Sequence, residues 1–259
     1  MTKRAAISTA ISDVHVNHVV VRGWDLCRDL IGKTSLTEYF LLLLMGAKPS
    51  VTLVAVTDAA IVAIAEHGFT PSVQVARMTL FAEPQSVQSA VAAGILGCGS
   101  VILGAAEIAG KLLIEVLTEA GQGNLDTAAT TALRRLKDRD QTVPGFGHPI
   151  HRSGDPRAAR LLEFARELNL PDRHVQALHA IERQIESVYG RRLVTNVSAA
   201  IPAVLLDAGF PQQALKGVPL LGRCAALIAH LEEERERRIA YHLSEQAVAG
   251  LQYDGPAAR

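Results

Sequence analysis

The chain has 259 residues, of which 49% are hydrophobic and 20% are charged, and its 26 basic side chains balance its 26 acidic ones. This length and apolar content suffice for a large buried core, in one domain or in two. Zero formal charge without a long basic run argues against a nucleic-acid partner, because nucleic acid is bound by clustered lysines and arginines.

The N-terminal region has the pattern of neither a signal peptide nor a membrane span. Two basic groups occur in residues 1–8, but no apolar segment of signal-peptide length precedes Asp13. The longest strongly apolar stretch in this region, residues 39–45, is far shorter than the roughly 20 residues that cross a bilayer. Cys27, Cys98 and Cys224 are widely spaced, which disfavours disulfides and a metal cluster. We therefore expect a cytoplasmic protein that binds no metal and no membrane.

The predicted elements are helical with one exception. Residues 14–22 alternate and are rich in β-branched side chains, as in a strand or half of a small hairpin. Ser35, with Glu38 three residues later, is a good N-cap for a helix that ends at Gly46. Further helices are predicted over 50–66, 71–81, 85–96, 101–120, 126–137, 156–168, 171–189, 196–208 and 216–240. The sequence thus predicts an all-α protein with a minor N-terminal strand or hairpin.

Residues 143–157, Val-Pro-Gly-Phe-Gly-His-Pro-Ile-His-Arg-Ser-Gly-Asp-Pro-Arg, form the most specific segment of the chain. The glycines before His148 allow positive φ or a close approach of the backbone to a bulky ligand, and the prolines stiffen the loop. Arg152 and Arg157 suit phosphate or carboxylate, because a guanidinium offers a planar fork of donors. We interpret the segment as an anion-binding site, with an ordinary Gly/Pro turn carrying surface arginines as the alternative.

This segment resembles the signature of the citrate synthase superfamily, a Gly-aromatic-Gly-His loop followed by an Asp-Pro-Arg turn. Agreement extends in order over roughly residues 20–235, and the short citryl-CoA lyases and the lyase module of ATP-citrate lyase are the most similar in size. The matching stretches are 22–26, 29–32, 41–46, 66–68 with Ser72, and 222–230. The resemblance implies a large helical domain from residues 1–106 and 196–259, a smaller inserted helical domain of residues 107–195, and an active site between them that a homodimer or higher homo-oligomer completes.

The same resemblance assigns roles to four side chains. His148 matches the histidine that polarises the ketone of oxaloacetate, and in cleavage it would take or share the proton of the tertiary hydroxyl. His67 matches a histidine that binds the oxaloacetate part, although a histidine facing its own helix dipole is an ordinary alternative. Arg157 and Arg223 match arginines that hold substrate carboxylates in fixed geometry.

Coenzyme A would enter as a substrate thioester rather than as a permanently bound cofactor. Its channel would be lined by Val143, Pro144, Gly145, Phe146 and Gly147, which offer backbone groups to the adenine, and Arg152 would meet a phosphate. A dinucleotide-binding Gly-x-Gly-x-x-Gly motif after a strand is absent from the sequence, so we expect no nicotinamide cofactor.

Two positions depart from the synthase pattern. Ile102 stands where a synthase has its enol-stabilising histidine. Ser198, in the stretch Asn196-Val197-Ser198, stands where a synthase has the aspartate that deprotonates acetyl-CoA, and we assign Asn196 and Ser198 with His148 to the catalytic group. A hydroxyl is a far weaker base than a carboxylate, and a general base contributes about 10²- to 10⁴-fold. Condensation is therefore disfavoured. The lyase branch also has an apolar residue at the position of Ile102. The ATP-citrate lyase module, in contrast, keeps the aspartate at the position of Ser198.

The sequence therefore favours an enzyme that cleaves citryl-CoA, or a similar 3-hydroxy-3-carboxylated acyl-CoA, to acetyl-CoA and oxaloacetate or another 2-oxo acid. Two alternatives stay open. One is a non-catalytic or regulatory homologue that binds a CoA thioester, and the other is a lyase for a different acyl-CoA. Of the remaining histidines, which we expect on the surface or in helix packing, His151 is the one to test because it lies beside Arg152.

Overall fold

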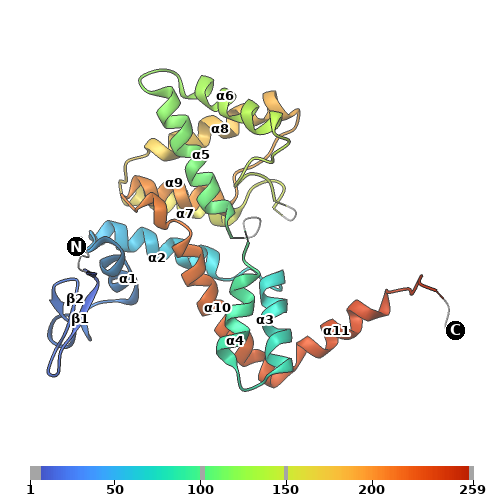
Figure 1. The fold of residues 1–259 in the computed structure, drawn as a ribbon. Coiled ribbons are helices and arrows are strands. Elements are labelled where there is room, and N and C mark those ends of the chain that lie inside the picture. The colour runs from blue at the N-terminus through green and yellow to red at the C-terminus, as the bar shows by residue number, and fades with distance from the viewer. Residues whose placement is uncertain (1–6, 100–102, 149–150, 257–259) are drawn as a thin grey trace, which may run out of the picture.

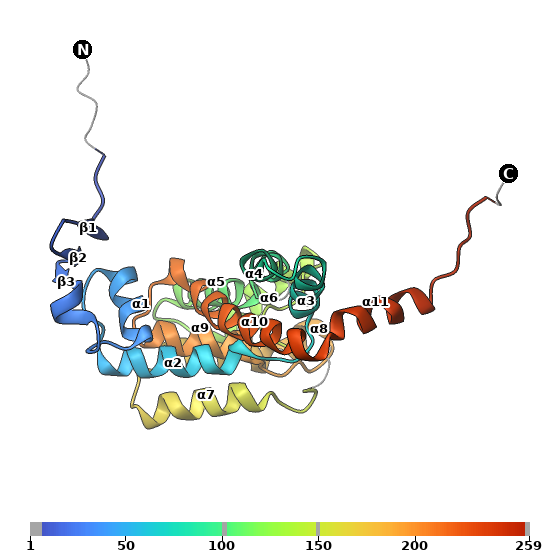
Figure 2. The ribbon, with the colours of Figure 1, turned by 90° about the horizontal axis from the view of Figure 1, so that it is seen from below.

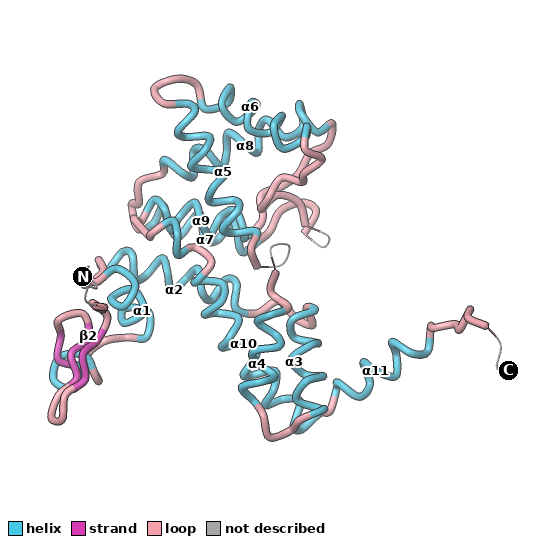
Figure 3. The backbone as a smooth tube through the Cα atoms, in the orientation of Figure 1, coloured by secondary structure: helices cyan, strands magenta, loops and turns pink. Residues whose placement is uncertain are grey.

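A computed structural model of the protein describes residues 7–99, 103–148 and 151–256. Within these ranges the fold is all-α with one small N-terminal sheet, as the sequence predicts (Figures 1 and 3). The helices are α1 (Leu36–Met45), α2 (Val51–Ala65), α3 (Pro71–Ala82), α4 (Val87–Leu96), α5 (Ala105–Ala120), α6 (Leu125–Asp138), α7 (Pro156–Glu167), α8 (Arg173–Tyr189), α9 (Val197–Asp207), α10 (Gly217–Arg237) and α11 (Ile239–Ala249). A π-helix (Leu26–Leu30) and a 3₁₀ turn (Gln212–Ala214) complete them.

Of the two alternatives predicted for residues 14–22, a strand or half of a small hairpin, the structure has a hairpin, whose turn lies within this stretch. Strands β1 (Ser12–Val14) and β2 (Val19–Val21) pair antiparallel, and β3 (Trp24–Asp25) pairs with β2. The amide of His15 donates to the carbonyl of His18 at 2.9 Å and closes the hairpin. The turn contains no glycine or proline, and Asn17 is the one residue in it that favours turns.

Helix ends follow the local signals where the sequence carries them. Ser35 Oγ accepts from the amide of Glu38 at 3.1 Å, and the Glu38 carboxylate accepts from the amide of Ser35 at 2.7 Å, which confirms the predicted capping box. Gly46 ends α1 with a φ of 77°. The helix predicted over 101–120 begins at Ala105 within the described residues, and residues 101 and 102 lie outside them.

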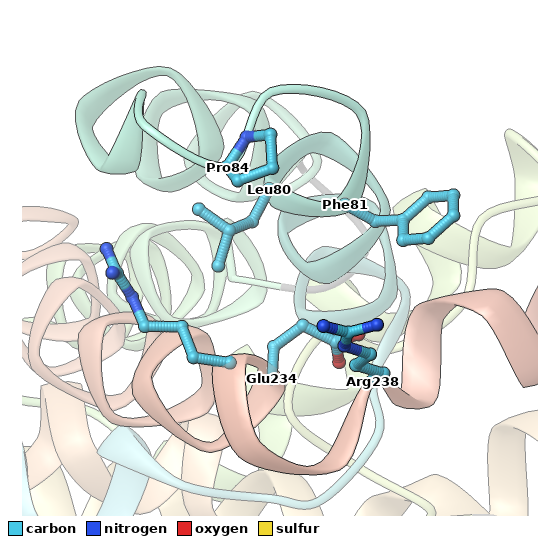
Figure 4. A pocket seen from close by; sticks show the side chains of 6 residues that line it. Leu80, Phe81, Pro84, Glu234 and Arg238 are labelled. Atoms are coloured by element: carbon cyan, nitrogen blue, oxygen red, sulfur yellow. The ribbon is translucent and has the colours of Figure 1, made fainter.

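The helix predicted over 216–240 is in fact two helices. Arg238 takes a left-handed φ of 46°, which ends α10 and begins α11, and no glycine or proline marks the break. The carboxylate of Glu234 accepts from the amide of Ala240 at 2.8 Å and satisfies the new helix start. A cavity of about 410 Å³ opens at this junction, where Leu80, Phe81 and Pro84 face the end of α10 (Figure 4).

Four hydrophobic clusters build the interior of the described chain. The first joins α5, α6 and α8, the second joins α2, α7 and α9, and the third joins α3, α4 and α10 (Figure 1). A small fourth cluster joins β2 and the π-helix to α1. Helix α9 contributes to both of the first two, so its residues 199–205 are buried on every side. Helix α7 lies within the predicted inserted domain, yet it packs with α2 and α9. The division into domains at residues 107 and 195 stays a prediction.

The C-terminal part of the chain extends away from the packed helices. Helix α11 projects away from the other helices, and among its residues only Ala240 is buried (Figure 2). By length and composition, the stretch Gln212–Arg237 with a mean hydropathy of 1.3 could cross a membrane. The core helix of a soluble protein can meet the same criterion, and 44% of the apolar window is buried in the fold, so this stretch is weak evidence for a span.

Candidate active site

A cavity of about 580 Å³ collects the side chains that the sequence singles out. It lies where the end of α2, the start of α9 and the middle of α10 meet the signature loop, defined here as residues 143–157. Seven of the predicted site residues line it, and they are His67, Gly147, His148, Arg157, Asn196, Ser198 and Arg223. The other described lining residues are Ile64, Phe69, Thr70, Pro71, Leu103, Ala105 and Val197, so mostly apolar side chains surround the predicted polar ones.

The two glycines of the loop have separate reasons for being glycine. Both take positive φ, 82° at Gly145 and 79° at Gly147, as the sequence predicts. A Cβ on Gly145 would stand 2.5 Å from the Cβ of Ala199, so the close approach that requires this glycine is to helix α9. Gly147 lines the cavity instead, and its amide donates to Val194 at 2.7 Å.

Asn196 fastens the loop to α9. Its Oδ1 accepts from the amide of Ser198 at 2.9 Å, as an N-cap does, and its Nδ2 donates to the carbonyl of Gly147 at 2.8 Å. Its amide also donates to Gly145 O at 3.0 Å. These contacts are those of a positioning residue, and the catalytic role assigned to Asn196 from the sequence stays a prediction.

The hydrogen bonds of His148 determine its neutral tautomer. The backbone amide of His151 can only donate, and it donates to Nδ1 of His148 at 3.1 Å. In the neutral ring the proton is therefore on Nε2. That nitrogen lies 3.3 Å from Nε2 of His67, which must then accept, with its own proton on Nδ1. The two rings thus present one donor and one acceptor side by side.

Burial and nearby cations keep both rings neutral near pH 7. Burial lowers the pKa of His67 most, and the charges of Arg157, His148 and His151 lower it further. Burial and the neighbouring His151 likewise lower the pKa of His148. The ring of His151 lies 4.6 Å from that of His148, centroid to centroid. The expectation that His151 is an ordinary surface or packing residue is therefore incomplete, because it shapes the donor pattern of the cavity.

Asp155 ties Arg157 to the start of α9. The guanidinium donates from Nε and Nη2 to the two carboxylate oxygens at 3.0 and 2.8 Å, and the amide of Val197 donates to the same carboxylate at 3.0 Å. Burial alone would raise the pKa of Asp155, but these hydrogen bonds outweigh it and lower the pKa to about 2. Arg157 therefore keeps Nη1 for a ligand, since that nitrogen makes no hydrogen bond to the described residues.

Arg223 is the buried cation of the cavity. Its side chain is 2% exposed, and among the described residues neither Nε nor Nη1 has a hydrogen-bond partner. A buried guanidinium without a carboxylate is costly. Its place in the cavity wall, near Arg157 and both histidines, makes a negatively charged ligand the natural partner.

The two departures from the synthase pattern differ in what the structure says of them. Ser198 is half-buried at the start of α9 and lines the cavity with a hydroxyl. Ile102 lies outside the described residues, and its described neighbour Leu103 lines the cavity with an apolar side chain.

A second cavity, of about 390 Å³, shares Gly147 with the first. Val143 and Phe146 line it, whereas Pro144 and Gly145 do not, and Arg152 is exposed outside the described lining of both cavities. Sequence reasoning missed Lys137 and Arg191, which bring two cationic side chains to the second cavity from outside the signature loop. No pattern in the sequence marks them, because they come from the ends of two separate helices.

Metal ligation finds no support in the part of the chain that the structure describes, where no group of three or more His, Cys, Asp or Glu side chains is placed to hold an ion.

Comparison with known proteins places this geometry in a family. The family model described as "Citrate synthase, C-terminal domain" matches residues 5–241. A 2-methylcitrate synthase of Shewanella oneidensis is 27% identical over 201 residues, which are 76% of this chain and 51% of that protein. The chain spans about half the length of the curated relatives that it matches.

Two solved structures are similar over nearly the whole chain. Citryl-CoA lyase from Hydrogenobacter thermophilus has a TM-score of 0.81 and 27% identity, and the match covers 98% of this chain and 96% of that one. ATP citrate lyase from Methanothrix soehngenii, solved in complex with citrate and coenzyme A, has a TM-score of 0.81 and 21% identity over 99% of this chain and 43% of that one. The second likeness is one of fold. With the family model matching most of its length, the chain belongs to the citrate synthase family.

Proposed function

We propose that the protein cleaves citryl-CoA, or a similar 3-hydroxy-3-carboxylated acyl-CoA, to acetyl-CoA and oxaloacetate or another 2-oxo acid. The observation that carries the proposal is the unpartnered, buried guanidinium of Arg223 in one cavity with His67, His148 and Arg157. The match to citryl-CoA lyase over 96% of that chain supports a lyase rather than a longer synthase. The hydroxyl at Ser198 supports the same direction, because cleavage needs no base to abstract a proton from the acetyl methyl.

The histidine pair suggests how the hydroxyl group of the substrate would react. When the hydroxyl oxygen replaces the hydrogen bond between the two rings, His67 Nε2 can accept the hydroxyl proton while His148 Nε2–H donates to the same oxygen. As the hydroxyl becomes a carbonyl, the bond between the carbon that bears it and the acetyl methylene breaks, and its electron pair passes to the thioester enolate. A proton from water then gives the methyl group of acetyl-CoA, and the hydroxide that remains takes up the proton held by His67, so atoms and electrons balance without an oxidant.

The two arginines would hold the carboxylates of the substrate. Arg223 would receive one of them as its missing buried partner, and Arg157 would offer Nη1 to another while Asp155 fixes its orientation. Two guanidiniums in fixed positions orient a polycarboxylate as well as neutralise it. The thioester end would extend past Gly147 into the second cavity, where Lys137 and Arg191 suit the phosphates of coenzyme A as a substrate.

The direct test is incubation with citryl-CoA, with oxaloacetate release followed through malate dehydrogenase and NADH absorbance. We expect turnover that His148→Ala lowers by about 10²-fold or more. The second candidate function is a regulatory homologue that binds a CoA thioester without reaction, which the hydroxyl at Ser198 favours. Tight binding of citryl-CoA without oxaloacetate release would support this second function and refute the first.

We also propose that the protein acts as a homodimer or higher homo-oligomer in the cytoplasm. Helix α11 exposes Tyr241 at 55% and Val248 at 63%, with Leu251 and Tyr253 exposed beyond it. An apolar arm of this kind is characteristic of a surface that another chain covers. The three free cysteines suit a reducing compartment. Light scattering should give a mass of at least twice 27.7 kDa, and deletion of residues 239–259 should reduce it.

A further inference from the structure

A cluster of charged side chains around the buried Arg77 lies beside the cavity, next to His67. Arg77 of α3 is fully buried, and its Nη1 donates to the carboxylate of Glu234 at 2.9 Å. Its Nη2 contacts Glu233 and also Nδ1 of His230, the latter at 2.9 Å. In turn, Nε2 of His230 lies 2.9 Å from the carboxylate of Glu66. The cluster therefore joins α3 and α10 to the residue just before His67.

The arginine imposes a direction on this chain of contacts. A guanidinium can only donate, so Nδ1 of His230 must accept and its Nε2 must carry the proton. That proton is then donated to Glu66. The other carboxylate oxygen of Glu66 accepts from the amide of Gly68 at 2.5 Å. Residues 66 and 68 are thus both held, and His67 lies between them.

The far side of the same loop is held by the same two residues. Phe69 lines the cavity, and its ring meets that of His230 edge-on, with centroids 5.7 Å apart. The guanidinium of Arg77 lies 4.9 Å from the centroid of the Phe69 ring, which is a favourable cation–π distance. His230 therefore contacts residues on both sides of His67, and Arg77 contacts Phe69 on one side, without either being among the described residues that line the cavity.

We propose that Arg77, His230 and Glu66 form a positioning relay that holds His67 against His148 in the reactive cavity. The relay rests on the proposed function only for its effect on catalysis, and its effect on the position of His67 can be measured without a substrate. Glu66 is the link to test first, because its side chain is 52% exposed and its removal leaves the buried ion pair of Arg77 and Glu234 intact. Glu115 of the distant helix α5 provides a matched control, since it is 50% exposed and also pairs with a basic side chain, Arg135 of α6.

The measurement is the pKa of His67, followed by NMR of histidine-labelled protein and assigned with His67→Gln. In the wild type this pKa lies below its ordinary value because of burial and of the charges of Arg157, His148 and His151, with Asp155 opposing them. Glu66→Ala removes a negative charge next to His67, which by itself can only lower the pKa further. A rise toward about 6.5 would therefore mean that the ring has left the buried site. We expect that rise in Glu66→Ala and none in Glu115→Ala.

Variants at residue 230 separate the two bonds of the relay. His230→Asn can still accept from Arg77 but cannot reach Glu66, so it should raise the pKa of His67 as Glu66→Ala does. His230→Gln places an amide donor near the position of Nε2 and should restore the wild-type value. If citryl-CoA is turned over, kcat/KM should fall by about 10- to 100-fold in Glu66→Ala, as expected for a displaced reactive group, with an unchanged melting temperature.

The possible outcomes distinguish the relay from the proposed reaction. An unchanged or lowered pKa of His67 in both Glu66→Ala and His230→Asn would overturn the relay. A raised pKa without any cleavage of citryl-CoA by the wild type would support the relay and refute the reaction.

Discussion

Replacing Arg223 with methionine should stabilise the ligand-free protein and weaken its binding of a polycarboxylate. Two nitrogens of this 2%-exposed side chain lack a partner among the described residues. Each unsatisfied buried donor costs about 1–3 kcal/mol, so the pair would cost about 2–6 kcal/mol, and water in the cavity would offset part of it. Methionine keeps most of the length and apolar volume. We therefore expect the free energy of unfolding to rise by about 1–3 kcal/mol.

Arg77 offers the matched control. It is as deeply buried as Arg223, but its guanidinium is paired with Glu234, whose side chain is 4% exposed. Arg77→Met would leave that carboxylate buried without its cation, and breaking a buried pair in this way costs about 3–5 kcal/mol. The same substitution at the same depth should thus change stability in opposite directions at the two sites.

Thermal unfolding with and without citrate, used as a carboxylate probe, tests both effects. In a chain of this length 1 kcal/mol shifts Tm by about 2–4 °C, so Arg223→Met should melt several degrees above the wild type without citrate. Citrate should raise Tm of the wild type but not of Arg223→Met, because losing a desolvated charge pair worth about 2–5 kcal/mol weakens binding by about 30-fold or more. If Arg223→Met instead melted below the wild type, as Arg77→Met should, the inference that this guanidinium awaits an anion would be refuted.

Further substitutions test Gly145 of the signature loop, the carboxylate of Asp155, and Ser198, which stands where a synthase has its aspartate base. Gly145→Ala should lower stability in urea by about 1–3 kcal/mol more than Gly209→Ala, because both positions have φ near 80° but only Gly145 has a neighbour that a Cβ would strike. Equal losses of stability in the two variants would mean that the positive φ alone accounts for the destabilisation. Since hydrogen bonds hold the pKa of Asp155 at about 2, its contribution, about 2 kcal/mol, is complete above the usual value near 3.9 and is lost as pH falls toward 2. In an acid titration, the stability of Asp155→Asn should not fall in this way. A stability profile like that of the wild type would contradict the prediction. Ser198→Asp should raise deuterium exchange at the methyl of acetyl-CoA above background in the presence of an unreactive oxaloacetate analogue, as followed by NMR. Rapid exchange by the wild type would mean that another group is the base.

The parts of the fold that the sequence predicts well are those with local chemical markers. The capping box at Ser35 and Glu38 and the glycine at residue 46 fix the ends of α1, and the structure has both. The break at Arg238 was missed because a non-glycine residue takes the left-handed conformation there, with Glu234 before it and Ala240 after it joined by a hydrogen bond that no sequence pattern marks. The hairpin turn was missed for a similar reason, since a backbone bond from His15 to His18 closes it without glycine or proline.

For the candidate site, the sequence predicts which residues meet but not how they are held. A motif brings His148 and Arg157 together because they are close in the chain, and the resemblance adds His67 and Arg223. Neither predicts the tautomer of His148, which depends on a backbone amide three residues later. The pairing of Arg157 with Asp155, two residues before it, was also missed. The contact of Asp155 with α9 could not be predicted, because its donor Val197 is 42 residues away in sequence.

That shared carboxylate has a kinetic consequence. Asp155 accepts from Arg157 and from Val197, and Asn196 bonds back to Gly145 and Gly147, so the loop and the first turn of α9 cannot open separately. Segments that open only together behave as one cooperative unit in hydrogen exchange. The amide protons of Gly147, Asn196 and Val197 should therefore share one opening rate, and a ligand that closes on Arg157 should slow all three at once.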